Sequence, residues 1–260
     1  MAASKSERAY ALALEQGTAE WLAFKAGKVG ASRVADIIAK RKDGASSSSR
    51  ATYRGELIAE QLTGVPTESY KSPAMQWGND CEPMARSAYQ FDQWCAVQQV
   101  GCALHPTIEN ALASPDGLVG DHGLVQIKCP LTATHLETVV NGPAAIPERY
   151  IVQMQWEMAC TGRRWCDYVS FDPRLPEAMR IYIRRFDRVD GRIKELEAEV
   201  AAFLSEIKTY LKALAKKYPK VDVVGLAGQQ RYLDPHDEMR RGEEWCNRIE
   251  QAVNDRRELI

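Results

Sequence analysis

Two short segments in the middle of the chain carry the side chains best suited to chemistry. Residues 114–118 read Ser-Pro-Asp-Gly-Leu, and residues 123–130 read Gly-Leu-Val-Gln-Ile-Lys-Cys-Pro. Asp116 lies at a predicted strand-to-turn junction, and Gln126 and Lys128 are two residues apart on the next predicted strand, so both project from the same face. Oxygen ligands suit a hard ion such as Mg²⁺, and a neighbouring lysine can orient or deprotonate a water. The pattern therefore indicates metal-assisted phosphodiester hydrolysis.

The elements that must position these groups follow from hydrophobic periodicity and turn residues. Thr18 can cap a first helix, and Ser32 opens a second helix after a glycine-rich turn. The spacing predicts further helices over residues 53–62, 82–91, 151–161, 193–214 and 244–253, and strands over residues 96–104, 111–114, 124–129, 167–171 and 179–184. The apolar stripe of residues 193–214 fits either a helix docked on the core or a contact with another subunit. The polar segment 42–49 is predicted to be a surface loop. This order predicts an α/β fold with a mixed β-sheet flanked by helices.

Composition narrows the class of protein. The chain has 260 residues, 34 Lys and Arg, 35 Asp and Glu, and a formal charge of −1, so binding to a polyanion must depend on local clusters. No apolar run approaches the roughly 18 residues of a membrane helix, and a cytoplasmic location in a bacterial or phage-infected cell is expected, with no membrane partner. Seven cysteines without a CxxC pair argue against a disulfide framework. The four histidines lack a metal-ligand spacing such as HExxH.

By itself, an aspartate followed by Gln-x-Lys is weak evidence, since exposed strand edges often carry such residues. The arrangement nevertheless resembles the PD-(D/E)xK nuclease superfamily. The sequence pattern SPDGL…IKCP is more specific and resembles the phage-type alkaline exonucleases (the lambda exonuclease or YqaJ viral recombinase family). Three further blocks over residues 16 to 185 have family-like order and spacing: Gln16-Gly17 with Trp21 and Gly30-Ala31-Ser32, Trp77-Gly78 with Glu82, and Tyr150 with Gln153 and Gln155.

The resemblance implies a restriction-endonuclease-like mixed β-sheet flanked by helices. It implies one nuclease domain over residues 1–260, with a core of about 16–185 and a C-terminal helical extension of about 186–260. The implied activity is a 5′-to-3′ exonuclease that digests linear double-stranded DNA and leaves a 3′ single-stranded overhang for recombination. Mg²⁺ is the implied cofactor, with Mn²⁺ as a substitute. The implied partners are DNA with a 5′-phosphate end, two further copies in a homotrimer, and a single-strand annealing recombinase.

The resemblance also assigns roles to residues. It implies a metal site formed by Asp116, Gln126, the backbone carbonyl of Ile127 and Glu82. Glu82 and Gln126 are also counted among the catalytic residues, together with Lys128 and Gln153. Lys128 would act on the attacking water or the scissile phosphate. Gln153 would face the site from its helix and position the phosphate or the lysine.

A second set of residues is implied to bind the 5′-phosphate of the DNA: Lys25, Ser32 and Ser114. Physical chemistry supports Ser32, because a helix N-terminus exposes unpaired N–H groups and the positive end of its dipole. Simple helix capping by Ser32 is an alternative that is compatible with phosphate binding. Lys25 replaces an arginine of better-known family members, which keeps the charge and loses the bidentate geometry.

Gln126 is the main departure from the family pattern, which has an acidic residue at this position. An amide oxygen can coordinate Mg²⁺, but a neutral ligand loses most of the Coulomb attraction that holds the ion. We therefore expect a catalytically impaired chain that Gln126→Glu would activate, unless another carboxylate compensates. Two alternatives stay open: a non-catalytic DNA-end-binding protein of the same fold, and a repair or restriction endonuclease.

Overall fold

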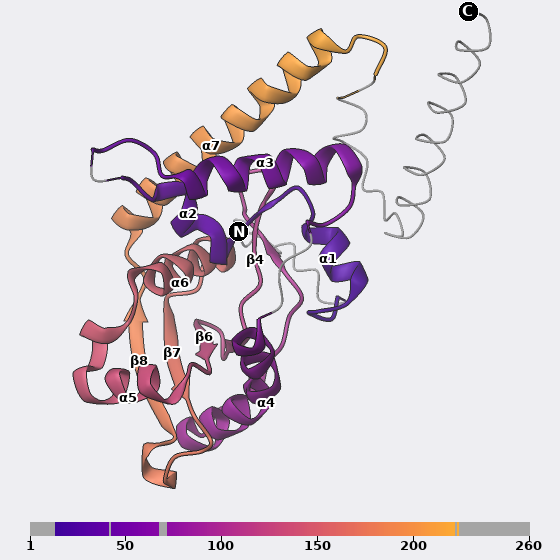
Figure 1. The fold of residues 1–260 in the computed structure, drawn as a ribbon. Helices are drawn as coiled ribbons and strands as arrows, with labels where there is room; N and C mark the ends of the chain where they lie inside the picture. Colours follow the sequence, from indigo (N-terminus) through magenta and orange to yellow (C-terminus); the bar gives the residue numbers. More distant parts are fainter. Residues whose placement is uncertain (1–13, 42, 68–71, 222, 224–260) are drawn as a thin grey trace, which may run out of the picture.

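The computed structural model describes residues 14–41, 43–67, 72–221 and 223 (Figure 1). Its larger sheet has five strands in the order β2-β5-β6-β7-β8. These strands are β2 (Val97–Gln98), β5 (Gly117–Val119), β6 (Gly123–Lys128), β7 (Trp165–Phe171) and β8 (Ile181–Asp187). The pair β6 and β7 is parallel, and the other neighbours are antiparallel. The sheet is therefore mixed, as predicted.

A smaller sheet stands beside it, with the order β1-β4-β3. It consists of β1 (Val29–Gly30), β4 (Ala111–Ala113) and β3 (Ala103–Leu104). The prediction of one strand over residues 96–104 was wrong, because this run divides into β2 and β3 in different sheets. The carbonyls between them are bound by side chains instead of a neighbouring strand: Gln16 Nε2 donates to Val100 O at 2.8 Å, and Trp21 Nε1 donates to Gly101 O at 2.9 Å.

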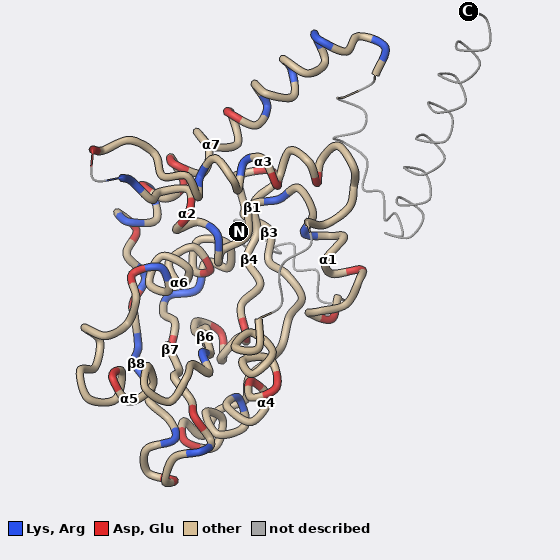
Figure 2. The backbone as a smooth tube through the Cα atoms, viewed as in Figure 1, with Lys and Arg blue, Asp and Glu red and all other residues tan. Residues whose placement is uncertain are grey.

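The described residues form seven α-helices and three short 3₁₀ turns. The helices are α1 (Ala19–Lys25), α2 (Val34–Ile38), α3 (Ser48–Thr63), α4 (Pro73–Gln93), α5 (Thr132–Asn141), α6 (Glu148–Thr161) and α7 (Asp190–Lys217), and the turns are η1 (Ala31–Arg33), η2 (Gly142–Ala145) and η3 (Glu177–Met179). Within the described residues, none of the helices is long and apolar enough to cross a membrane. Figure 2 shows basic and acidic residues interspersed along the tube.

Several predicted boundaries are confirmed and others are corrected. Thr18 caps α1 by accepting from Trp21 N, and α3 ends at Gly64 as predicted. Ser32 was expected to open a helix, but it lies inside the 3₁₀ turn η1, whose N-cap is Gly30. Helix α4 begins well before the predicted residue 82, because Ser72 provides an N-cap and Pro73 fits the first turn. Helix α5 and strands β1 and β5 were not predicted. The loop predicted over residues 42–49 ends earlier than expected, because α3 begins at Ser48. The helix predicted over residues 244–253 lies outside the described residues.

The two faces of the larger sheet pack against different helices. Alternate residues of β6 follow the two-residue period of a strand. Val125 and Ile127 join a cluster with Tyr89 of α4, whereas Leu124 joins a cluster with Met154 of α6. Gln126 is on the α6 side and is buried. Helix α6 also reaches the smaller sheet, where the Trp156 indole donates to the Leu112 carbonyl at 3.2 Å.

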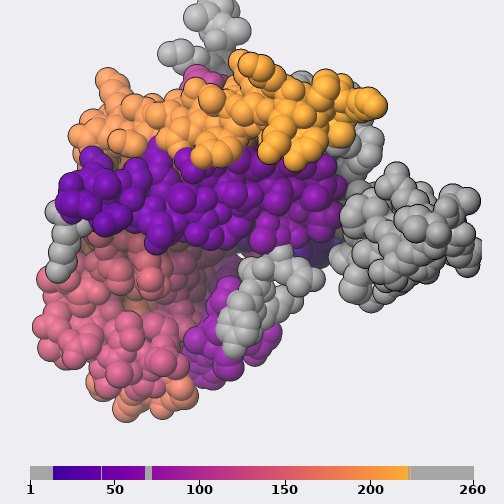
Figure 3. Space-filling view, turned by 45° about the horizontal axis from the view of Figure 1, so that its top comes forward, coloured from indigo at the N-terminus to yellow at the C-terminus, as the bar shows by residue number. Residues whose placement is uncertain are grey.

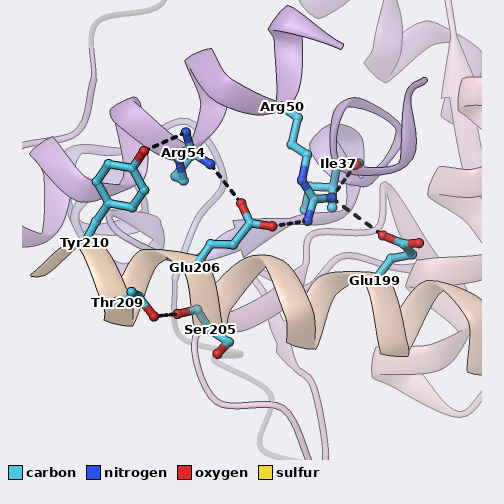
Figure 4. A network of polar contacts seen from close by, with 8 residues as sticks. All are labelled: Ile37, Arg50, Arg54, Glu199, Ser205, Glu206, Thr209 and Tyr210. Atoms are coloured by element: carbon cyan, nitrogen blue, oxygen red, sulfur yellow. Dashed lines mark hydrogen bonds and ion pairs between the residues drawn. The ribbon is translucent and has the colours of Figure 1, made fainter. Parts of the chain in front are cut away.

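Helix α7 lies along α3 on one face of the molecule (Figure 3). Its apolar stripe is buried in the cluster that contains the smaller sheet, so it is docked on the core. Figure 4 shows the polar contacts between the two helices: the buried Arg50 side chain lies 2.6 Å from Glu206 and donates to the Ile37 carbonyl at 2.6 Å. Arg54 binds the other Glu206 oxygen at 2.9 Å. One carboxylate therefore joins two arginines of α3 to α7.

Candidate active site

The turn from β5 to β6 brings Asp116 beside Gln126. Gly117 pairs with Val125 across these antiparallel strands, so the residues on either side of that pair are also neighbours. The Asp116 Oδ2 atom accepts hydrogen bonds from the Ile127 backbone N–H, at 2.6 Å, and from the Gln126 side-chain amide. A carboxylate offers only acceptors, so the nitrogen of the Gln126 amide faces it. The amide oxygen of Gln126 points away from Asp116.

That oxygen continues a chain of hydrogen bonds into helix α6. Gln153 Nε2 donates to Gln126 Oε1 at 2.7 Å and also to Glu157 Oε1 at 2.9 Å. Glu157 has no exposed surface, and its Oε2 atom has no hydrogen-bond partner within the described part of the chain. Glu157 was not among the site residues predicted from the sequence. Its position four residues after Gln153 on a predicted helix was the available signal, since such residues share a face.

Burial is the main influence on the pKa values of the two carboxyl groups in this hydrogen-bonded path. It raises the pKa of Asp116 to about 6; nearby Lys128 opposes the shift, whereas Glu82 increases it. Burial also raises the pKa of Glu157 to about 8, with a further increase from the charge of Asp116, while the hydrogen bond from Gln153 lowers it. Two carboxyl groups therefore hold their protons unusually strongly on either side of two amides.

Glu82 of α4 and Asp116 line the same groove. One part of it, about 470 Å³, also contains Ile127, Lys128 and Tyr150. The other part, about 710 Å³, extends towards Gln16 and Trp21 and shares Met75, Asn79, Glu82 and Asp116 with the first. The Lys128 ammonium lies 4.9 Å from the centre of the Tyr150 ring. A carboxylate, a second carboxylate and a lysine thus meet in a groove large enough for part of a nucleic acid strand.

The donor set fits a divalent ion only in part. Within the described ranges, no group of three or more His, Cys, Asp or Glu side chains could hold a metal ion. Asp116 and Glu82 offer carboxylates, but Arg86 is paired with Glu82 Oε1. Gln126 presents its amide nitrogen to Asp116 Oδ2, and a nitrogen that carries two hydrogens cannot bind a metal. The residues expected as metal ligands are therefore brought together, with one negative charge fewer than the family pattern has.

A separate hollow of about 200 Å³ contains two of the three residues expected to bind phosphate. Lys25 and Ser32 both line it. Further charged residues of the hollow, which the sequence analysis did not single out, are Lys28, Arg33, Glu56 and Glu60. The Lys25 ammonium lies 3.7 Å from the centre of the Trp21 ring, and burial lowers its pKa.

Ser114 is placed differently from Lys25 and Ser32. It does not line this hollow, and its hydroxyl instead lies 3.3 Å from the Cys102 sulfur. The positive charges of Lys25 and Lys28 act to lower the pKa of the Cys102 thiol, although burial raises it overall. Ser114 is therefore near the hollow through Cys102 without forming its wall. All six cysteines within the described residues are free thiols, as the sequence analysis expected of a chain without a disulfide framework.

Comparison with known proteins decides the family. A model described as "YqaJ-like viral recombinase domain" matches residues 20–164. The chain belongs to this family. Its fold matches the crystal structure of the alkaline exonuclease LHK-Exo from Laribacter hongkongensis with a TM-score of 0.72 and 48% sequence identity, covering 78% of this chain and 99% of that one. The structure of LHK-Exo in complex with dAMP gives the same values.

More distant comparisons add less. A phage-related exonuclease from Haemophilus somnus 129PT matches with a TM-score of 0.57 and 18% identity, over 72% of this chain and 96% of that chain, which supports the fold alone. A comparison with curated proteins gives no significant match.

These findings confirm the resemblance to the phage-type alkaline exonucleases and the restriction-endonuclease-like fold. The YqaJ-like chain is accordingly a nuclease of the exonuclease type, and DNA is the substrate that its family implies. A divalent metal ion is the cofactor that a nuclease of this family suggests. Gln126, the residue that departs from the family pattern, is also the residue whose side chain contacts Asp116.

Proposed function

We propose that this protein digests linear double-stranded DNA from a 5′ end and leaves a 3′ single-stranded overhang for recombination. The observation that carries the proposal is the meeting of Asp116, Glu82 and Lys128 in one groove of an alkaline exonuclease fold. The groove is open enough to admit a DNA strand, and its carboxylates and ammonium are the groups that phosphodiester hydrolysis needs. Residues 1–260 are proposed to form one nuclease domain.

In this proposal Asp116, Glu82 and the Ile127 carbonyl would hold Mg²⁺, or Mn²⁺ in its place, and Gln126 would contribute only if its amide were turned. The ion would stabilise charge on the phosphate and lower the pKa of a bound water. Lys128 orients the attacking water or the scissile phosphate from the same wall of the groove. Gln153 keeps the residue at position 126 in place through its hydrogen bond of 2.7 Å.

The hollow that contains Lys25 and Ser32 is proposed to bind the 5′-phosphate. Three basic residues line it, and Ser32 is exposed within it. Ser114 would contribute from the side of Cys102. A bound terminal phosphate would set the distance between the DNA end and the groove, and this would favour cleavage near an end over cleavage within a duplex. The restriction or repair endonuclease is the less favoured alternative for this reason.

Assembly is proposed from family membership. A homotrimer that encloses DNA would keep the enzyme on its substrate, and a single-strand annealing recombinase would bind the exposed 3′ strand. Light scattering at micromolar concentration tests the assembly, and a monomer would contradict it.

A non-catalytic DNA-end-binding protein is a second candidate, and one observation favours it. The Gln126 amide nitrogen, hydrogen-bonded to Asp116 Oδ2, occupies a position where the family has a metal-binding carboxylate. Such a chain would bind DNA ends and cleave slowly or not at all. Our proposal is therefore an exonuclease whose activity is impaired in this form, and the two candidates differ in whether Gln126→Glu restores cleavage.

The test is digestion of linear duplex with either 5′-phosphate or 5′-hydroxyl ends, in Mg²⁺ and in EDTA. We expect slow nucleotide release by the parent chain and faster release by Gln126→Glu, with a preference for phosphorylated ends. Lys128→Ala in the Gln126→Glu background is the matched inactive control. Binding without cleavage in every variant would favour the end-binding protein, and internal cuts in a circular duplex would favour the endonuclease.

A further inference from the structure

Glu157 is a buried acid that the proposed mechanism does not use. It has no exposed surface, and one of its two carboxyl oxygens has no hydrogen-bond partner among the described residues. A buried carboxyl group with an unpaired oxygen is costly, and the single hydrogen bond from Gln153 offsets only part of that cost. Stability alone therefore does not account for a carboxyl group at this position.

The charges around Asp116 indicate what the group can do. The charged side chains that act on Asp116 most strongly are Lys128, Glu82 and Arg86. The two basic groups cancel the charges of Asp116 and Glu82, and Arg86 is directly paired with Glu82. With a neutral Gln126 in the middle, a divalent ion would enter surroundings without net negative charge, which is unfavourable for binding.

Glu157 is connected to this position by a continuous path. Its Oε1 atom accepts from Gln153 Nε2 at 2.9 Å, and the same nitrogen donates to Gln126 Oε1 at 2.7 Å. A negative charge on Glu157 strengthens its own hydrogen bond from Gln153 and acts on the Asp116 end of the path across a dry interior, where screening by water is weak. The path ends at Asp116, where Gln126 donates to the carboxylate.

We infer that Glu157, once it has lost its proton, supplies the negative charge that Gln126 lacks, and that it acts on the metal site from behind Gln153 without binding the metal itself. Glu157 is therefore a positioning residue of this chain. The inference depends on the proposed divalent-metal site and adds a specific residue to it. The interaction of Glu157 with Asp116 and Lys128, which raise and lower its pKa respectively, agrees with its closeness to that site.

Metal binding measured without DNA tests the inference separately from cleavage. Mn²⁺ is titrated by calorimetry at pH 8.5 into the parent, Glu157→Gln, Gln126→Glu and the double variant. We expect Glu157→Gln to weaken Mn²⁺ binding of the parent by about tenfold or more, because one nearby charge at an effective dielectric constant near 20 has at least this effect. In the Gln126→Glu background the same change should matter by less than about threefold, because position 126 then carries the charge.

Two further variants serve as controls. Glu148→Gln removes an exposed charge from the start of the same helix and should leave Mn²⁺ binding unchanged. Glu157→Asp keeps the charge, so it should bind Mn²⁺ within about threefold of the parent, whereas a role that needs the exact side-chain length would make it as weak as Glu157→Gln. Thermal unfolding without metal checks that each variant is folded. If Glu157→Gln does not fold, the Glu157→Asp result decides.

Three outcomes would overturn the inference. The first is unchanged Mn²⁺ binding in folded Glu157→Gln, and the second is an equal loss in both backgrounds. The third is a tenfold loss in Glu157→Asp. If none of the four chains binds Mn²⁺, the proposed metal-dependent function fails as well. Tight Mn²⁺ binding that is the same with and without the Glu157 carboxylate refutes this inference alone.

Discussion

Replacing Gln126 with Glu exchanges a hydrogen bond to Asp116 for repulsion between two carboxyl groups. The Gln126 amide donates to Asp116 Oδ2, and a glutamate would face this oxygen with a second acceptor. Without a cation the two carboxyl groups would have to share a proton. Burial already raises the pKa of Asp116 to about 6, and a nearby second carboxylate would raise it further. The metal-free variant should therefore be less stable than the parent.

The size of the effect follows from this contact. Loss of a buried hydrogen bond to a charged group costs about 1–3 kcal/mol. For a protein of this size that corresponds to a fall in Tm of roughly 3–10 °C at neutral pH in EDTA. The pH dependence has a defined sign. The pKa of Asp116 is raised in the folded state from 3.8, so the folded state binds the proton more tightly and the free energy of unfolding increases as pH falls from about 6 towards 3.8. Gln126→Glu should extend this dependence to higher pH.

Thermal unfolding of the parent and Gln126→Glu, in EDTA and in excess Mg²⁺, measures these effects. We expect a lower Tm for the variant in EDTA and a larger Mg²⁺-dependent increase than the parent shows, because a cation relieves the repulsion and binding stabilises the folded state. Gln99→Glu is the matched control, since Gln99 is exposed in the same groove. An unchanged Tm in EDTA, together with equal Mg²⁺ shifts in parent and variant, would refute the electrostatic reasoning about position 126.

The other predictions concern three separate places in the molecule. In the Gln126→Glu background, Lys128→Ala should abolish nucleotide release while DNA affinity and its salt dependence change little, since one phosphate contact alters the salt slope by about 1; parallel loss of binding in a gel-shift assay would indicate a structural lysine. Lys25→Ala should reduce the preference for 5′-phosphorylated over 5′-hydroxyl ends, and equal rates of the unsubstituted chain on both ends would contradict the phosphate site. Glu206→Gln removes the carboxylate that joins Arg50 and Arg54 to α7 and should lower the free energy of unfolding by about 1–2 kcal/mol, measured by denaturant titration. No change there would show that the apolar contacts of α7 suffice.

Local signals in the sequence predicted the elements whose periodicity is strong. Helix α7 repeats its apolar residues at helical spacing over its full length, and α3 ends at Gly64, which adopts the left-handed conformation typical of a helix C-terminus. The division of residues 96–104 between two sheets had no comparable signal. It depends on Gln16 and Trp21, which bind the carbonyls of Val100 and Gly101 from far away in the sequence. Such contacts exist only after the chain has folded.

The candidate site shows the same contrast. The two-residue period of a strand was enough to predict that Gln126 approaches Asp116, and the structure confirms the contact. The turn expected at Gly117 was wrong, because Gly117 begins β5. Glu157 was missed because its one signal, the four-residue spacing from Gln153 on the predicted helix, does not by itself indicate burial. Ser114 was grouped with Lys25 and Ser32 by resemblance, but its hydroxyl lies against Cys102.

The position of α7 shows that the family model and the folding unit have different limits. The family match ends at residue 164, yet Val200 and Phe203 of α7 are completely buried in the cluster that also contains Val34 and Ile37 of α2. Helix α2 directly follows the turn η1, which holds Ser32 at the hollow, whereas the groove depends on the larger sheet and α4. A part of the chain beyond the family model thus supports the wall of the hollow. Substitutions in α7 that alter this packing are expected to change the shape of the hollow while leaving the residues of the groove in place.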